Sequence, residues 1–121
     1  YLIGLGEERE SRIDPSILDD WTGCFVAQLG APPAERMGAG DEVILLDVAT
    51  GSQASSTKAD SGGWKVRQHG PLRLWDAVEN AIETWQKAGS PHQSEFGLTV
   101  SRSGQCVWLG EPDGPRWSLP V

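Results

Sequence analysis

One short segment gathers the residue types that bind anionic groups. Arg67, His69 and Arg73 include two of the ten Lys and Arg residues and one of the two histidines. Guanidinium and imidazolium groups form charge-assisted hydrogen bonds with carboxylates, and a junction between a strand and a helix often carries binding residues. These three residues are the predicted substrate-binding residues, for an acidic peptide or a carboxylate. The alternative is that they are ordinary solvent-facing side chains.

Two pairs of adjacent acids, Asp19 with Asp20 and Asp41 with Glu42, are the other groups that could do chemistry. Neighbouring carboxyl groups can divide acid and base roles when burial makes them differ. Both pairs lie at the edges of expected elements, where solvated or helix-capping acids are more common. A small hydrolase that uses one of these pairs is therefore the least favoured function.

Other kinds of site lack a residue pattern. Two glutamates follow Gly4-Leu5-Gly6, and an apolar strand follows Gly38-Ala39-Gly40, so neither glycine pair opens a helix that could hold a phosphate. His69 and His92 lie apart from each other and from the cysteines, which excludes the clustered ligands of a metal site. We predict no catalytic residue, no cofactor site and no metal site in this chain.

Charge and composition limit the partners. The net charge of −7 over 121 residues disfavours nucleic acid and anionic membrane surfaces, because binding to both depends on Lys and Arg. The chain has no secretory signal and no apolar stretch of spanning length, so we expect a cytoplasmic protein. Cys24 and Cys106, each in an apolar run, are then expected to be buried free thiols.

The expected elements give an α+β fold. Apolar and polar residues alternate over 64–68, which predicts a strand with one buried face. Apolar residues recur at helical spacing over about 71–88, which predicts the principal helix; its stripe consists of Trp75, Val78, Ile82 and Trp85.

We predict a mostly antiparallel sheet of about six strands with this helix packed on it. Residues 1–20 are a linker or N-terminal segment that ends in a short helical turn, and residues 21–121 form a single α+β domain. The remaining strand signals are the apolar runs at 24–29 and 42–48, a weak edge strand within 50–63, and a hairpin of 96–100 with 105–109, followed by a turn and a short tail.

Tryptophan is the other candidate for an interface, because it anchors contacts between proteins out of proportion to its number. Four of the six tryptophans fall on predicted inward faces. Trp21 and Trp117 lie at the edges of elements, and these two are the predicted interface residues.

Four segments of the second half of the chain form a series: His69–Glu79, Phe96–Val100, Val107–Leu109 and Pro112–Asp113. This series resembles the C-terminal domain of bacterial protein-L-isoaspartate O-methyltransferase-like enzymes, including those that tailor lanthipeptides and other ribosomally made peptides. The resemblance covers residues 62–121 well, residues 21–60 loosely and residues 1–20 hardly at all.

The resemblance implies a parent enzyme that transfers a methyl group from S-adenosylmethionine to an Asp or isoAsp carboxylate of a peptide. In that family the cofactor and the reacting groups belong to a preceding Rossmann-like domain, and a start at Tyr1 without methionine favours a fragment. The expected role is an accessory, substrate-binding domain whose partners are that N-terminal catalytic domain and the peptide. The alternative is a free-standing peptide-binding module that recruits a precursor peptide to a separate enzyme.

Overall fold

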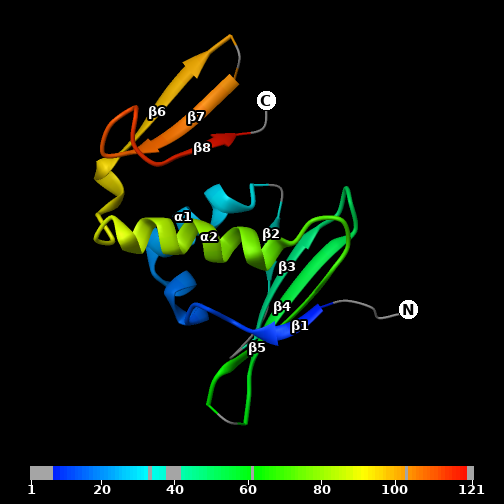
Figure 1. The fold of residues 1–121 in the computed structure, drawn as a ribbon. Helices are drawn as coiled ribbons and strands as arrows, with labels where there is room; N and C mark the ends of the chain where they lie inside the picture. The colour runs from blue at the N-terminus through cyan, green and yellow to red at the C-terminus, as the bar shows by residue number, and fades with distance from the viewer. Residues whose placement is uncertain (1–6, 33, 38–41, 61, 103, 120–121) are drawn as a thin grey trace.

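The computed structural model describes residues 7–32, 34–37, 42–60, 62–102 and 104–119. Within these residues, two α-helices and two short 3₁₀ helices accompany two antiparallel sheets of five and three strands (Figure 1). The structure confirms the predicted α+β class. It corrects the single sheet of about six strands, because the C-terminal strands form a sheet of their own.

The larger sheet has the strand order β1-β5-β4-β3-β2. The apolar run at 42–48 and the alternating run at 64–68 are confirmed as β3 and β5. Val66 faces the core as the alternation predicts, and the polar Gln68 is buried on the same face. The five strands are β1 (Glu7–Glu10), β2 (Glu35–Met37), β3 (Val43–Asp47), β4 (Ser52–Lys58) and β5 (Trp64–His69).

Strand β4 is wrongly predicted as an edge strand, because it lies at the centre of this sheet. Its inward side chains are small, and Ser52, Ala54 and Ser56 are fully buried. Small side chains give a weak strand signal in sequence, yet here they leave room for the helix that packs on the sheet.

Strand β1 shows that part of the predicted linker belongs to the sheet. Its four residues are all charged, so no apolar pattern marks them as a strand. Ladder bonds to β5 and ion pairs take the place of apolar packing, with Glu8 opposite Arg67. The 3₁₀ helix at Pro15–Asp19 confirms the short helical turn expected at the end of this segment.

Residues 24–29 are wrongly predicted as a strand, because they belong to helix α1 (Trp21–Gly30). The side chain of Asp20 caps this helix and accepts a hydrogen bond from the N–H of Gly23 at 3.1 Å. Gly30 lets α1 approach the second helix, since a Cβ there would lie 2.6 Å from the carbonyl oxygen of Ala77. A short apolar run does not distinguish a strand from a buried helix.

Helix α2 (Leu74–Lys87) confirms the predicted principal helix and begins a few residues later than predicted. Its apolar stripe is buried between the larger sheet and α1. No helix among the described residues has the length and apolar content needed to cross a membrane.

The smaller sheet has the order β6-β7-β8 and follows a second 3₁₀ helix at Gln93–Glu95. It confirms the predicted hairpin, while β8 was expected only as a tail. Phe96 joins this sheet to α1 through an edge-to-face contact with Phe25, at 5.1 Å between ring centroids. The strands are β6 (Phe96–Ser101), β7 (Gly104–Leu109) and β8 (Arg116–Leu119).

Both cysteines are free thiols, as predicted. The predicted burial of Cys24 is wrong, because its side chain is exposed on α1, and Cys106 is half-buried on β7. Cys106 lies on the face of β7 opposite the buried Val107 and Leu109, and an apolar run does not show which face of an element is buried.

Candidate functional site

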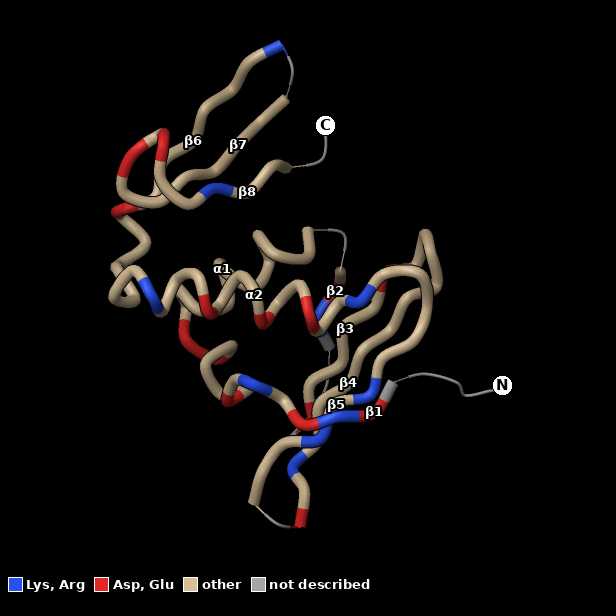
Figure 2. Tube along the Cα trace, viewed as in Figure 1, with Lys and Arg blue, Asp and Glu red and all other residues tan. Residues whose placement is uncertain are grey.

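The side chains of β5 alternate between two environments. Val66 and Gln68 are buried against α2, while Lys65, Arg67 and His69 are exposed on the opposite face. Lys and Arg residues gather where β1 and β5 run side by side (Figure 2). We call the surface formed by Glu8, Lys65, Arg67 and His69 the outer sheet face.

A carboxylate already lies on the outer sheet face. The Nε of Arg67 is 2.6 Å from one carboxylate oxygen of Glu8, and the Nζ of Lys65 is 3.8 Å from the other. The Arg67 side chain is 69% exposed, and an exposed pair of this kind contributes only about 0–1 kcal/mol. Glu8 is therefore held only weakly at this position.

His69 extends this face by one position. It lies two residues after Arg67 on the same strand, about 7 Å along the face, and it is exposed opposite Gln53 of β4. The structure thus brings together two of the three predicted substrate-binding residues.

Arg73 lies elsewhere, at the start of α2. Its Nε is 2.5 Å from a carboxylate oxygen of Asp76, and Asp76 also accepts hydrogen bonds from Arg9 and from the side-chain amide of Gln68 at 2.9 Å. Arg73 therefore belongs to a second group, the inner ion cluster, which consists of Arg9, Arg12, Arg73, Asp76 and Glu79.

Glu79 is the centre of the inner ion cluster and is fully buried. It accepts hydrogen bonds from the backbone N–H of Arg12 at 2.6 Å and from the guanidinium of Arg9, with one contact at 3.0 Å. These bonds tie the N-terminal segment to α2. Sequence reasoning missed this role, although Glu79 follows Trp75 by four residues and so falls on the apolar stripe, where an acid requires a partner.

The electrostatics of the cluster favour ionised carboxylates. Burial raises the pKa of Glu79, but hydrogen bonds from Arg9 and the Arg12 backbone outweigh it and leave the pKa below its usual value. Burial likewise raises the pKa of Asp76, and hydrogen bonds from Arg73, Gln68 and Arg9 lower it far more. The cluster therefore stabilises the fold only while both acids are charged.

We expect a corresponding dependence of stability on pH. The pKa values of Asp76 and Glu79 are lower in the folded chain than in the unfolded chain, so their contribution is present above about pH 4–5 and is lost as the pH falls further. Urea unfolding at several pH values should show a shallower loss of unfolding free energy for Asp76→Asn than for the wild type. Asp113→Asn, at an exposed turn, serves as the control, and parallel curves for all three would contradict the expectation.

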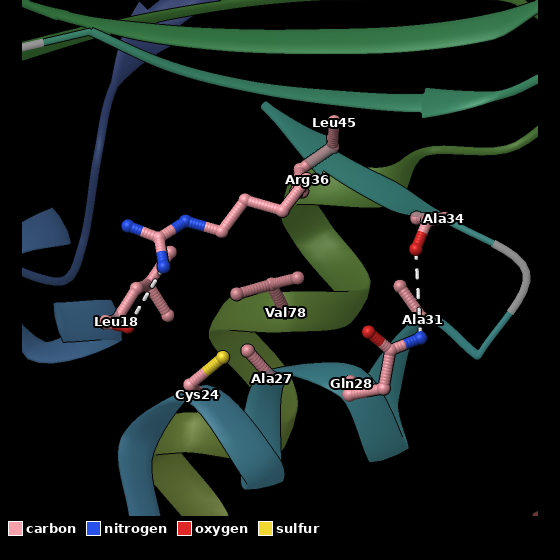
Figure 3. A pocket seen from close by; sticks show the side chains of 9 residues that line it. All are labelled: Leu18, Cys24, Ala27, Gln28, Ala31, Ala34, Arg36, Leu45 and Val78. Atoms are coloured by element: carbon pink, nitrogen blue, oxygen red, sulfur yellow. Dashed lines mark hydrogen bonds between the residues drawn. The ribbon is translucent and has the colours of Figure 1, made fainter. Parts of the chain in front are cut away.

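A small hollow lies between α1, β2, β3 and α2 (Figure 3). Cys24 borders it, and Arg36 crosses it to donate a hydrogen bond to the carbonyl oxygen of Leu18 at 3.0 Å. Its cavity volume of about 20 Å³ holds one water molecule, whereas sites for small organic ligands are at least ten times larger. The hollow is a packing defect rather than a ligand site.

The described residues of the two acid pairs lie in different settings. Asp20 caps α1, and Asp19 is exposed and lies 2.9 Å from Arg36. Glu42 is exposed directly before β3, while Asp41 lies outside the described residues. The capping reading is therefore confirmed for Asp20.

The two predicted interface tryptophans lie in different environments. Trp21, at the first position of α1, is 78% exposed. Trp117 on β8 is half-buried and packs against Phe96, with 6.0 Å between ring centroids. Trp21 has the exposure that an interface anchor requires, and Trp117 mainly supports the smaller sheet.

Comparisons with known proteins identify no relative of this chain. No family model, no curated protein and no solved structure matches the chain. The family resemblance of residues 62–121 therefore stays a prediction, and the site is defined by its own geometry.

Proposed function

We propose that this chain is the accessory, substrate-binding domain of a cytoplasmic, S-adenosylmethionine-dependent enzyme of the protein-L-isoaspartate O-methyltransferase type. The enzyme methylates an Asp or isoAsp carboxylate of a peptide. The cofactor and the reacting groups belong to a preceding Rossmann-like domain. The observation that carries the proposal is the residue series at 69–79, 96–100, 107–109 and 112–113.

The location of the series favours a structural role for its residues rather than a catalytic one. Its first segment leads from the end of β5 into α2, and the other three lie in the smaller sheet and its connections. These segments supply buried packing residues such as Trp75 and Leu109. A resemblance carried by such residues concerns the fold of a domain, and function is argued from its surfaces.

The outer sheet face is the surface that suits a peptide carboxylate. Glu8 occupies the position that such a carboxylate would take, between Lys65 and Arg67. Arg67 can hold a carboxylate by a charge-assisted hydrogen bond, and His69 lies one position further along the strand. Arg73 instead stabilises the start of α2 through its ion pair with Asp76.

Binding at a remote surface can serve the reaction. A methyltransferase that selects one carboxylate must orient a flexible peptide, and binding energy away from the reacting atoms can fix that orientation. In this account the outer sheet face holds the peptide, and the exposed Trp21 contacts the catalytic domain.

Calorimetry with S-adenosylmethionine tests whether the cofactor site lies outside this chain. Titration of the cofactor into this chain is expected to give no binding heat, because the cofactor site lies in the other domain. A control titration into a class I methyltransferase confirms that the cofactor is active. Tight binding by this chain would contradict the proposal.

The coding sequence upstream of Tyr1 separates the proposal from a free-standing peptide-binding module. A strand, a glycine-rich turn and a helix N-terminus within about 200 residues, a usual domain length, is the expected finding. A start codon immediately before Tyr1 would favour the module instead.

A further inference from the structure

Strand β6 forms an edge of the smaller sheet, because the strand order is β6-β7-β8. Its six residues, Phe96–Ser101, include no charged residue and no proline. Edge strands are normally protected by such residues, since an unprotected edge can pair with another strand. β6 therefore has the composition of a pairing strand.

The register of the hairpin shows which backbone groups face the open edge. The N–H of Gly110 donates to the carbonyl oxygen of Glu95 at 2.9 Å, one step before the pair of Phe96 with Leu109. Bonded and non-bonded pairs alternate in an antiparallel ladder. The N–H and C=O groups of Leu98 and Val100 consequently point away from β7, toward the edge, whereas the N–H of Phe96 donates to the carbonyl oxygen of Gln93.

The side chains of Leu98 and Val100 are exposed as well, while that of Phe96 is half-buried. Leu98 is 57% exposed and Val100 is 65% exposed. On the other side of the strand, the indole ring of Trp108 lies against Gly97, and its Nε1 donates to the Oγ1 of Thr99 at 3.0 Å. The hairpin is thus held in shape, and its outer edge presents the backbone groups of Leu98 and Val100 beside their apolar side chains.

The charges at the two ends of β6 are opposite. Arg102 lies at the tip of the hairpin, and three acids lie at its base (Figure 2). When two β6 strands pair antiparallel, the tip of each meets the base of the other. The edge is therefore complementary to itself, as a twofold interface requires; the acids at the base are Glu95, Glu111 and Asp113.

We propose that two copies of this chain pair through antiparallel β6 strands, so that the two smaller sheets become one continuous sheet. The edge-facing N–H and C=O groups of the two strands can form hydrogen bonds with each other when Leu98 of one copy lies opposite Val100 of the other. That register places Arg102 opposite Phe96 of the second copy, one position from Glu95, so that the positive end of each strand lies beside the negative end of the other. Twofold symmetry repeats this arrangement. The inference does not depend on the proposed methyltransferase role.

The expected affinity is modest. One pair of short strands and two exposed apolar side chains from each copy fall at the small end of specific interfaces. We expect a dissociation constant on the order of 10–100 μM, so that association appears only at high protein concentration.

Sedimentation velocity of the chain over a concentration series tests the pairing. The wild type is expected to shift from monomer to dimer, and Leu98→Lys should stay monomeric because an edge lysine blocks pairing. Val100→Pro should have the same effect, since it removes an N–H that faces the edge and leaves the bonds to β7. Val48→Lys is the matched control, because Val48 is 72% exposed and lies outside the smaller sheet. This variant should dimerise like the wild type.

A charge exchange identifies the second copy as the occupant of the edge. Arg102→Glu and Glu95→Arg should each weaken dimerisation alone, because each places like charges together. An equal mixture of the two variants should restore association, since opposite charges then meet at both ends. Circular dichroism confirms that each variant is folded. A wild type that stays monomeric at every concentration, a dimer unaffected by Leu98→Lys, or a mixture that does not associate would overturn the proposal.

Discussion

Replacing Glu79 with alanine is expected to lower the free energy of unfolding by about 3–5 kcal/mol. Glu79 is fully buried and accepts hydrogen bonds from Arg9 and from the backbone of Arg12. Removing its carboxylate leaves the backbone N–H of Arg12 without this acceptor and takes one of two carboxylate partners from the partly buried guanidinium of Arg9, which keeps Asp76. Each loss carries a desolvation cost. Urea unfolding followed by tryptophan fluorescence measures this change.

Glu83→Ala provides the matched control for this prediction. Glu83 lies one turn further along α2 and pairs with Arg12 at 3.3 Å, but it is partly exposed. Its loss should cost less than about 1 kcal/mol. Equal effects of the two substitutions would show that the buried carboxylate has no special role. Loss of the strand β1 contacts in Glu79→Ala, seen by amide hydrogen exchange, would support the link between α2 and the N-terminal segment.

Trp75→Ala is expected to destabilise the chain by a similar amount, about 3–5 kcal/mol. The Trp75 side chain is fully buried between α2 and the sheet, and its Nε1 donates a hydrogen bond to the Oγ of Ser11 at 3.0 Å. The substitution opens a large cavity and leaves the Ser11 hydroxyl without this donor. Thermal unfolding by calorimetry measures the loss.

Trp21→Ala is the control for Trp75→Ala, because Trp21 is 78% exposed. Its substitution should change the free energy of unfolding by less than about 0.5 kcal/mol. A large loss of stability for Trp21→Ala would contradict its description as a solvent-facing residue. A small loss for Trp75→Ala would contradict the packing of α2 on the sheet.

The elements with strong periodicity could be predicted from sequence. The apolar stripe of α2 and the alternation of β5 each match one structural period, and the hairpin of β6 and β7 is marked by its glycine-containing turn. Each pattern is local, so that residues close in sequence contain the whole signal.

The remaining elements depend on contacts between distant residues. Helix α1 owes its state to the cap at Asp20 and to the close approach of Gly30 to α2. Strand β1 is placed by its pairing with β5 and by the ion pairs of Arg9 with α2. No local period reports such contacts, and tertiary context overrides propensity in both cases.

The candidate site, too, has a part that follows from a local pattern and a part that depends on contacts between distant residues. Arg67 and His69 could be placed on one exposed face from the alternation of β5 alone. The ion pair of Arg73 with Asp76 and the carboxylate of Glu8 beside Arg67 could not be predicted, because they depend on where α2 and β1 lie. The position of Glu8 is the feature that makes the outer sheet face a testable carboxylate site.

Binding of an acidic peptide to the outer sheet face tests the proposed role most directly. A fluorescein-labelled, aspartate-containing peptide is titrated at low salt with the wild type and three variants, and anisotropy reports binding. Arg67→Ala should weaken binding about tenfold, since a charge-assisted hydrogen bond contributes about 1.5–3 kcal/mol. Glu8→Gln should strengthen it by freeing Arg67 and Lys65.

Arg116→Ala is the matched control, because it removes the same charge from β8 that Arg67→Ala removes from β5. This variant should bind the peptide like the wild type. Equal affinity of all four proteins, or no binding by any of them, would contradict the account.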